Sequence, residues 1–400
     1  MSELSYLEKL LDGAEVEWLP LSSLCNLITT GKLNANAMED NGAYPFFTCN
    51  EEPYRINTYA FDLEAILISG NGSQVGHLNY YNGKFNAYQR TYILGGFNEN
   101  VDIMYLYYYL MHTLKPYIHK NSRKGSVPYI TMPMLENFKF PIPCPNNLEK
   151  SLAIQSEIVR ILDKFTALTA ELTAELNMRK KQYNYYRDQL LSFKEGEVEW
   201  KTLEEVLVDK FWIMPATPKF DDNGEIPYIT SKNISGGNID FERVKHISRD
   251  DFLSISKNRP ILKGDFLISM IGTIGEIARV KCLDPDFYGQ NMYLIRLNEE
   301  LLHPRYFLHF FDSPRMKFYF KSVKNNSGQG YLKANNIDGL SIPLPSIDEQ
   351  QKIAFILDKF DTLTNSITEG LPREIELRQK QYEYYRDLLF SFPKPETVSN

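Results

Sequence analysis

The stretch RKKQYNYYRDQLLSF at Arg179–Phe193 occurs again as RQKQYEYYRDLLFSF at Arg378–Phe392. We call these two stretches the first arm and the second arm. Eleven of their fifteen positions are identical, which two unrelated helices would not reach by chance. A self-similar stretch of this kind marks an internal duplication, here with a period of about half the chain.

The duplication extends on both sides of the arms. IVRILDKF at 158–165 matches IAFILDKF at 353–360, and the EVEW at 197–200 repeats the EVEW at 15–18. Between these anchors the likeness is weaker but stays in register. The sequence therefore reads as variable block, helix, variable block, helix. Nearly identical helices suggest mutual pairing or a shared partner, and divergent blocks suggest that each block reads something different.

We therefore predict an α+β fold, with two similar globular mixed α/β domains joined by two long antiparallel helices that form an intramolecular coiled coil with a pseudo-twofold repeat. Alternate three- and four-residue spacing of apolar residues favours the coiled coil. The predicted parts are 1–147, a first globular domain with an N-terminal helical stub; 148–195, a first helical spacer; 196–345, a second globular domain; and 346–400, a second helical spacer and tail. The apolar seams are Ile154, Ile158, Ile161, Phe165, Leu168 and Leu172, and Ile353, Ile356, Phe360, Leu363 and Ile367.

Within the blocks, apolar runs and turn residues predict matching elements. Pro116 is expected to help end the first block's helix, and Pro372 to kink or break the second spacer helix. From Leu148 to Phe193 a straight helix would run roughly 70 Å. The predicted strands are Ala65–Ser69, Tyr88–Leu94, Phe266–Ser269 and Asn291–Leu297, and the predicted helices of the blocks are Leu4–Leu11, Val101–Leu114 and His303–Phe311.

Composition narrows the class of protein. The 400 residues carry a formal net charge of −7, whereas nucleic-acid binders are typically basic. The net charge therefore argues against nucleic-acid binding, unless local basic loops make the contact. The four cysteines show no C-x-x-C pair, which predicts a reduced compartment and a cytoplasmic location. The N-terminus is not of signal-peptide type, and the longest apolar run, Ile103–Met111, is too short to span a bilayer. We therefore predict no membrane association.

No motif points to catalysis. The chain contains no G-x-x-x-x-G-K-[ST] phosphate loop and no G-x-S-x-G nucleophile elbow. The six histidines show no metal-ligand spacing, and ordinary structural roles explain them better than a metal site. The glycines at 70, 72 and 76 read as a turn at a strand end. We predict no metal, no bound cofactor and no active site.

Two basic, amide-rich stretches occupy the same place in both blocks, at His119–Ser126 and Lys321–Gly330. Lys and Arg neutralise phosphates, and Asn, Gln and Arg can form paired hydrogen bonds to adenine or guanine edges. A solvated surface loop is the plain alternative for any single residue, but the matched placement favours DNA binding. The predicted DNA-binding residues are Gln89, Arg90, Lys120, Asn121, Arg123, Lys124, Gln290, Asn291, Lys321, Lys324, Asn325, Asn326 and Gln329.

The arms are rich in tyrosine and in basic residues, a composition that also suits protein binding. Their near identity favours two copies of one partner, with one copy on each arm. The predicted partner-binding residues are Tyr183, Tyr186, Arg187, Tyr382, Tyr385 and Arg386.

Taken together, the chain resembles the specificity subunit of type I restriction–modification systems. The carriers of the resemblance are the ILDKF at 161–165 and 356–360, the IPLPSIDEQQKIA at 342–354, and the two arms. The resemblance implies that each domain reads one half of a split, asymmetric site in double-stranded DNA, and that the helices set the spacer. The first copy departs from the pattern, being seven residues longer between its PIP and its ILDKF, which leaves the start of its helix open.

The resemblance also implies partners. Two modification subunits would dock on this chain to give an adenine-N6 methyltransferase that uses S-adenosylmethionine, and two motor/nuclease subunits would complete the restriction enzyme. An adenine methyltransferase would be expected to carry an [NDS]-P-P-[YFW] tetrapeptide, and this chain has no Pro-Pro pair. A non-catalytic subunit is therefore favoured. The alternatives are a stand-alone methyltransferase, which would need a cofactor motif, and a coiled-coil scaffold without a role on DNA.

Overall fold

The computed structural model describes residues 6–122, 128–325 and 330–393. Its internal contacts divide the chain into two units. Unit one contains Met1–Glu171 together with Ile375–Asn400, and unit two contains Leu172–Glu374. Each unit therefore holds one block, the helical segment that follows that block, and the arm of the other repeat.

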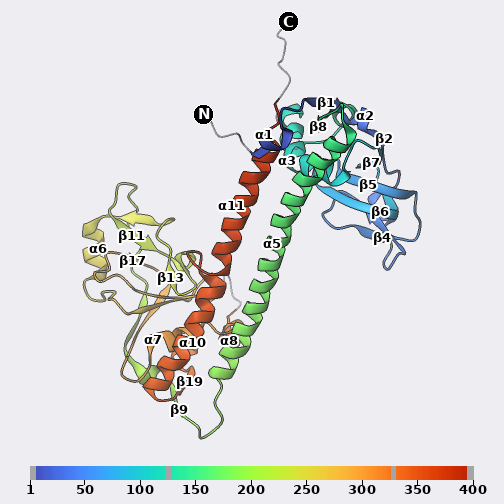
Figure 1. Ribbon diagram of the computed structural model, residues 1–400. Helices are drawn as coiled ribbons and strands as arrows, with labels where there is room; N and C mark the ends of the chain where they lie inside the picture. Colours follow the sequence, from blue (N-terminus) through green and yellow to red (C-terminus); the bar gives the residue numbers. More distant parts are fainter. Residues whose placement is uncertain (1–5, 123–127, 326–329, 394–400) are drawn as a thin grey trace. The chain divides into compact units, whose positions relative to one another are not determined.

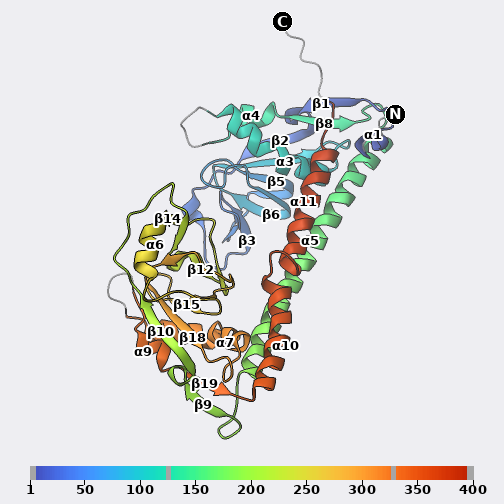
Figure 2. The same cartoon turned by 90° about the vertical axis from the view of Figure 1, so that its left-hand side faces the viewer.

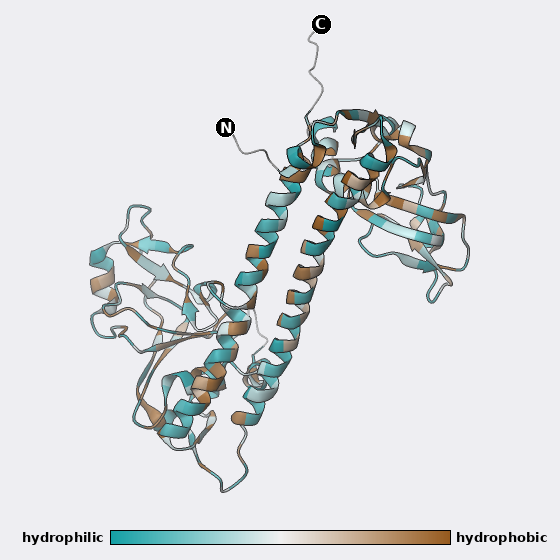
Figure 3. Ribbon diagram, in the orientation of Figure 1, coloured by the Kyte–Doolittle hydropathy of each residue, from teal (hydrophilic) through white to brown (hydrophobic). Residues whose placement is uncertain are grey.

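The long helices are α5 (Leu148–Leu190, 43 residues), α10 (Ile347–Asn365) and α11 (Leu371–Leu389), shown in green and red in Figure 1. The start of α5 at Leu148 settles the point that the sequence left open. The second spacer is broken between α10 and α11, as predicted, and Pro372 lies in the first turn of α11, where a missing N–H costs nothing. Apolar and polar residues alternate along these helices, as Figure 3 shows by colour.

Contacts between the helices show that they run antiparallel. In unit one, Phe165 of α5 stacks on Tyr385 of α11. In unit two, Tyr186 of α5 stacks on Phe360 of α10. Later residues of α5 thus meet earlier residues of the second spacer, which agrees with the predicted coiled coil.

The buried face of the spacer helices agrees only in part with the predicted apolar seam. Ile154, Ile158 and Ile353 are buried as predicted. Leu162 and Leu357, which were not predicted, are fully buried too, while Ile356 is 42% exposed and Ile367, beyond the end of α10, is 80% exposed. The reason is that the first turns of each spacer pack mainly on the block of their own unit. This face needs four-residue spacing, as in Ile353 and Leu357, and not the alternating spacing of a coiled-coil seam.

Unit one is built around a six-stranded sheet (Figure 2). The sheet is antiparallel except for β3 and β6, which pair in parallel. In sheet order its strands are β2 (Cys25–Thr30), β7 (Thr91–Phe97), β5 (Phe61–Ser69), β6 (Leu78–Ala87), β3 (Tyr44–Phe47) and β4 (Tyr54–Ile56). The smaller elements are α1 (Tyr6–Leu11), β1 (Val16–Pro20), α2 (Leu21–Leu24), η1 (Ala35–Ala37), α4 (Met132–Glu136) and β8 (Lys139–Pro143), and β8 pairs with β1.

Both faces of this sheet are covered. Along β5, Ile66 and Ile68 face the main core, which includes helix α3 (Ile103–Asn121), whereas Ala65 and Leu67 belong to a second cluster on the opposite face. The strand predicted from Tyr88 begins only at Thr91. Tyr88 itself opens a tight turn, because the N–H of Thr91 donates to the C=O of Tyr88 (2.8 Å). The residue pair 89–90 therefore lies in a turn and not in a strand.

Helix α3 spans Ile103–Asn121, so the prediction that Pro116 helps to end this helix was wrong. Proline inside a helix loses one backbone hydrogen bond. Here the apolar face continues beyond the proline, with Leu114 and Ile118 buried, and the Tyr117 hydroxyl donates to the C=O of Met134 (3.1 Å). These tertiary contacts compensate for the lost bond.

Unit two repeats the plan with more and shorter strands. Its central sheet has the order β10 (Leu207–Ile213), β18 (Met292–Leu297), β15 (Phe266–Ser269) and β16 (Ile277–Arg279). The remaining strands are β9 (Glu199–Thr202), β11 (Ile226–Ile229), β12 (Ile234–Ser235), β13 (Asn238–Ile239), β14 (Lys245–Ile247), β17 (Tyr288–Gly289) and β19 (Ser341–Leu344). The helices are η2 (Leu203–Val206), η3 (Ser231–Asn233), α6 (Arg249–Ser256), α7 (Pro304–Phe311), α8 (Pro314–Val323) and α9 (Ala334–Asp338).

The central strand of unit two alternates as β5 does. Phe266 and Ile268 face the core that holds α7, and Leu267 faces the second cluster. The predicted strand Phe266–Ser269 is confirmed, as is the helix that begins at Pro304. Helix α8 was not predicted as a separate element. Ser313, whose side chain caps its first turn, marks where this second helix starts.

Candidate nucleic-acid interface

Three segments of unit one are joined by backbone hydrogen bonds where strand β5 ends. The N–H of Gly70 donates to the C=O of Arg90 (2.8 Å), and the N–H of Ile130 donates to the C=O of Gly70 (2.9 Å). The Tyr92 hydroxyl also donates to Ile130 (2.8 Å), and burial, opposed by the charge of Arg90, raises the pKa of Tyr92 and keeps it protonated. The turn that carries Gln89 therefore lies beside the chain that follows the basic stretch.

The end of α3 reaches the same place. Gly76 has a φ of +78°, and a Cβ built there would lie 3.0 Å from Cδ1 of Ile118. The turn after β5 therefore packs directly on the last turns of α3. Those turns carry Lys120 and Asn121.

Unit two has the same framework. The N–H of Met270 donates to the C=O of Asn291 (3.4 Å), and the N–H of Leu332 donates to the C=O of Met270 (2.9 Å). A Cβ built at Gly275 would meet Phe320 of α8 at 2.8 Å, so this turn packs on the helix whose last turn carries Lys321. The backbone scaffold is repeated, while the side chains that it presents differ between the units.

The predicted DNA-binding residues fall into three groups. Exposed residues are Gln89, Arg90, Lys120, Asn121 and Lys321, and partly buried residues are Gln290, Asn291, Lys324 and Asn325. Arg123, Lys124, Asn326 and Gln329 lie outside the described residues. In unit one the framework hydrogen bonds join Arg90, Gly70 and Ile130, and the packing of Gly76 on Ile118 brings the end of α3 to the same turn. In unit two the hydrogen bonds bring 290–291 near the segment around 331.

Three of these residues lie in helices and not in loops as predicted. Lys120 and Asn121 belong to the last turn of α3, and Lys321 belongs to the last turn of α8. The apolar faces of α3 and α8 extend further than the polar composition of these stretches suggested. Basic residues in a last helical turn also interact favourably with the helix dipole.

Three of the amide side chains form hydrogen bonds inside their own unit. The Asn121 amide donates to the C=O of Tyr117 (2.8 Å), and the Asn325 amide donates to the Tyr331 hydroxyl (2.9 Å). The Gln290 carbonyl accepts from Tyr228 (3.4 Å), whose pKa burial raises to about 12. Asn121 and Asn325 thus support local structure, and the exposed Gln89 is freer to meet a ligand.

The six predicted partner-binding residues divide sharply by exposure. Tyr183 and Arg187 are buried in unit two, where the Tyr183 hydroxyl lies 3.0 Å from Nδ1 of His309. Tyr382 and Arg386 are half-buried in unit one. Tyr186 is 46% exposed and Tyr385 is 39% exposed.

The neighbouring tyrosines were missed although they are more exposed. Tyr185 is 61% exposed and Tyr384 is 65% exposed. Each forms an edge-to-face pair with the next tyrosine, with ring centroids 5.4 Å and 5.3 Å apart in the first and second arm. Helical spacing could have predicted this exposure, because residues two apart on a helix point in different directions. Tyr185 therefore cannot share the buried face of Tyr183.

A second missed pair consists of two fully buried glutamines. Gln350 accepts from the N–H of His303 (2.8 Å) and donates to the C=O of Leu301 (3.0 Å). In unit one Gln155 accepts from the N–H of Asp102 (2.8 Å) and donates to the C=O of Asn100 (2.9 Å). These glutamines tie each spacer helix to the start of its block's main helix.

The described residues hold no group of three or more His, Cys, Asp or Glu side chains placed to bind a metal ion. In the same part of the chain, no helix combines the length and the apolar character that crossing a membrane requires. The features that stand out are the repeated loop framework and the repeated arms.

Comparison with known proteins agrees with this picture. Residues 14–179 and 196–377 match the family model described as the type I restriction modification DNA specificity domain. Across the whole of both chains, the sequence is 42% identical to the type I restriction enzyme EcoR124I/EcoR124II specificity subunit of Escherichia coli. It is 38% identical to the EcoprrI specificity subunit of the same organism, covering 92% of this chain and 93% of that one.

Solved structures show the same fold. The crystal structure of a type I restriction-modification system S subunit from M. genitalium matches with a TM-score of 0.57 and 16% identity, covering 96% of this chain and 98% of that one. The predicted resemblance and the predicted fold class are thereby confirmed. The chain belongs to the family of type I restriction–modification DNA specificity subunits.

Proposed function

We propose that the two units read the two halves of a split DNA site for a type I restriction–modification complex. The chain acts as the DNA specificity component of that complex and carries no catalytic role. The observation that carries the proposal is the repeated loop framework, in which the same backbone hydrogen bonds present different side chains, Gln89 and Arg90 in unit one and Gln290 and Asn291 in unit two. A shared backbone scaffold that presents different side chains suits two domains that bind different DNA sequences. We assign the reading to 1–147 and 196–345.

Within each unit the side chains divide by chemistry. Arg90, Lys120 and Lys321 are exposed cations suited to phosphates, whose contacts fix position and carry no sequence information directly. Gln89 and Asn291 have amides suited to base edges in the major groove. We propose that phosphate contacts at the ends of α3 and α8 seat each unit, and that the neighbouring turn reads bases.

The helices are proposed to set the spacing between half-sites. Helix α5 has 43 residues, a length of about 65 Å at about 1.5 Å per residue. Two-half-site readers commonly place their recognition elements about 34 Å apart, one turn of duplex. A continuous helix is stiff enough to transmit a change in its length to the distance between reading elements.

Modification and restriction subunits are the proposed protein partners. We propose two modification subunits, one on each arm, because the exposed tyrosine pairs at 185–186 and 384–385 recur with the same geometry. S-adenosylmethionine would then be bound by the modification subunit and not by this chain. A reduced, cytoplasmic setting suits these partners and the four free cysteines.

The test is single-molecule methylome sequencing of a host that expresses this chain with its cognate modification subunit, compared with a host lacking this chain. A split adenine-methylated motif present only with the chain is the expected result. Replacing block one by the block of a relative with another target should change one half of the motif and preserve the other. An assembled complex without any such motif, or a block exchange without effect, would support a scaffold instead.

A further inference from the structure

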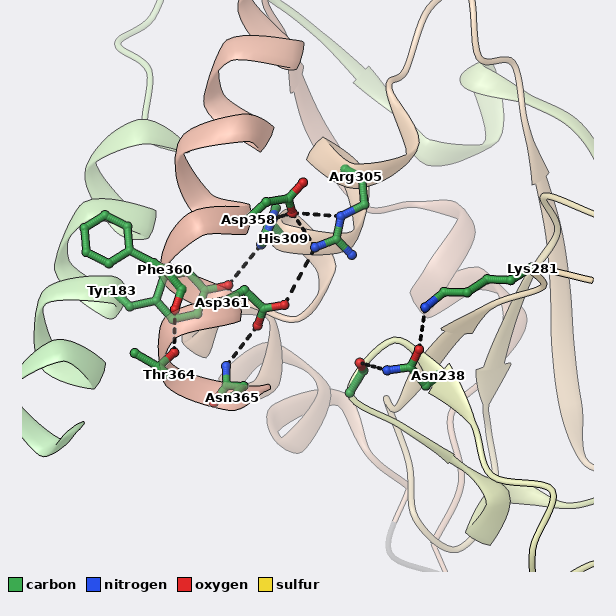
Figure 4. Close-up of polar contacts among 11 residues, drawn as sticks. Tyr183, Asn238, Lys281, Arg305, His309, Asp358, Phe360, Asp361, Thr364 and Asn365 are labelled. Carbon is green, nitrogen blue, oxygen red and sulfur yellow. Dashed lines mark hydrogen bonds and ion pairs between the residues drawn. The ribbon is translucent and has the colours of Figure 1, made fainter. Parts of the chain in front are cut away.

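Unit two contains an open cleft with a volume of about 1130 Å³. Its wall is formed by the first arm, the hairpin of β12 and β13, helix α7 and the end of α10. Figure 4 shows the polar side chains at this cleft, with Arg305 and His309 turned toward Asp358 on one side, and Lys281 bonded to Asn238 on the other.

The lining of the cleft includes a buried arginine that has no carboxylate partner among the residues that the structure describes. Arg187 is 6% exposed and lies over the ring of Tyr183, with its guanidinium carbon 4.6 Å from the ring centroid. One terminal nitrogen donates to the Asn184 side chain (2.8 Å), but Nε has no hydrogen-bond partner among the described residues. The corresponding arginine in unit one, Arg386, forms an ion pair with Asp387 at 2.8 Å. Burying a charge without a counter-charge is costly.

Two further cations at the cleft are also not neutralised. Lys281 bonds the Asn238 amide oxygen (2.6 Å), and neither it nor Lys180 lies within 4.0 Å of a carboxylate in the part of the chain that the structure describes. Other cations of the cleft are paired, as Lys317 is with Asp312 (2.8 Å). Three positive charges therefore face a cleft in a chain whose net charge is negative.

The charges at the cleft differ between the two repeats, whereas Tyr183 and Arg187 recur as Tyr382 and Arg386. Lys180 corresponds to Gln379 of the second arm, and Arg305 corresponds to Met104 of α3. The β12–β13 hairpin belongs to a part of block two that is longer than its counterpart in block one, because 229–268 corresponds to 47–68. A partner that binds both arms alike would contact repeated residues. DNA fits a set of cations that occurs in one repeat only, because its contacts with the two units differ.

We propose that this cleft binds a backbone phosphate of duplex DNA through Arg187, Lys180 and Lys281. The proposal rests on the proposed DNA-reading function and adds a contact outside the loop framework. A guanidinium forms paired, charge-assisted hydrogen bonds with phosphate, and the two ammonium groups add compact charge. The contact strengthens binding to any sequence, because phosphates carry no base information directly.

The test measures DNA affinity of the complex with the modification subunit over a salt series. Fluorescence anisotropy would use one duplex carrying the methylated motif and one scrambled duplex of equal length. Lys180→Gln, which installs the residue of the second arm, and Lys281→Gln should each lower the salt slope of the affinity by up to about 0.9, the value for one neutralised phosphate. Both duplexes should lose affinity by the same factor of several-fold, so that the preference between them stays constant. Lys352→Gln, on an exposed part of α10, is the control and should change neither slope nor affinity.

Unchanged salt slopes in Lys180→Gln and Lys281→Gln would overturn the proposal. If these variants instead weaken only the assembly with the modification subunit, the cleft takes an acidic side chain of that partner. If inorganic phosphate raises the melting temperature of the wild type but not of the variants, while the salt slopes of DNA affinity are the same for all of them, the cleft binds free anions. This result, like weakened assembly alone, would reject DNA as the ligand of the cleft. If the wild-type complex binds the motif duplex and the scrambled duplex equally well, the DNA-reading function is rejected. The salt slopes of the variants would then still decide whether the cleft binds a DNA phosphate.

Discussion

Tyr385 of the second arm stacks on Phe165 of the first repeat, with ring centroids 5.3 Å apart and ring planes at 25°. Unit two contains the reciprocal pair, in which Tyr186 of the first arm stacks on Phe360 at 5.5 Å and 26°. Each arm therefore completes the unit that contains the other repeat's block. The two repeats therefore do not fold as independent halves, because each arm packs in the unit that contains the block of the other repeat.

The first prediction concerns this stacked pair. We expect a double-mutant cycle of Phe165→Ala and Tyr385→Ala to show a favourable coupling of about 0.5–1.5 kcal/mol in the free energy of unfolding, because offset aromatic pairs add to simple burial. Urea unfolding measures it. The exposed Tyr384, which does not stack on Phe165, serves as the control in a second cycle with Phe165→Ala. Equal coupling in both cycles would mean that the stacking does not hold the arm.

The second prediction concerns the buried glutamine of unit two. Gln350→Ala should destabilise unit two by about 2–4 kcal/mol, because the His303 N–H and the C=O groups of Leu301 and Pro345 lose their partner, and the bond to Pro345 is buried. Its neighbour Gln351 is exposed, so Gln351→Ala is a matched control with an expected change near zero. Thermal or urea unfolding would distinguish the two variants, and similar stabilities would refute the role of Gln350.

The repeat and its consequences could be predicted from the sequence because they are local. Identity between the arms, the break near Pro372 and the strand Phe266–Ser269 depend on residues that are close in the chain. The exchange of arms could not be predicted in this way. It depends on which helix each arm meets, and identical arms give no preference for either block.

Other differences have the same origin in tertiary contacts. Pro116 remains inside α3 because Ile118 and Tyr117 beyond it are held by the core and by Met134. Tyr183 was predicted to bind a partner, yet it is buried against His309, a residue far away in sequence. For the DNA-binding residues, composition indicated the regions, but only the backbone hydrogen bonds of Gly70 and Met270 showed which segments meet.

The third prediction concerns pH. Asp358 accepts hydrogen bonds from Nε2 of His309 (2.7 Å) and from Nε of Arg305 (2.8 Å), as Figure 4 shows. Burial acts to raise the pKa of Asp358, but these bonds outweigh burial and lower it from 3.8 to about 2. The folded state thus binds this proton more weakly than the unfolded state. The stabilisation is complete above about pH 4 and is lost as pH falls toward 2.

Asp358→Asn should therefore flatten the loss of stability between pH 4 and pH 2 while lowering stability at neutral pH by about 1–3 kcal/mol. Arg305→Met, which installs the residue of the other repeat, should flatten it in part, since one donor to the carboxylate remains. Urea unfolding at a series of pH values measures both effects. An acid profile of Asp358→Asn identical to that of the wild type would show that this carboxylate does not carry the dependence.

The fourth prediction concerns helix length and the DNA spacer. Helix α5 contains the tetrapeptide Thr-Ala-Glu-Leu twice in succession, at 169–172 and 173–176. A third copy inserted after Leu176 adds about 6 Å of helix at about 1.5 Å per residue. That length is close to two base pairs at about 3.4 Å each. If the helix sets the spacing, the methylated motif should keep both half-sites and gain one or two base pairs between them, as read by methylome sequencing.

The matched control inserts the same four residues after Glu195, in the exposed turn that follows the first arm. This insertion lengthens the chain without lengthening α5, so the spacer should stay constant. The two insertions together separate a mechanical effect of the helix from a general effect of added chain. If the DNA spacer stays constant with the helix insertion, or if the half-sites change while the spacer does not, the distance between half-sites is fixed elsewhere. Four added residues of rigid helix cannot be absorbed without moving the domains that the helix connects.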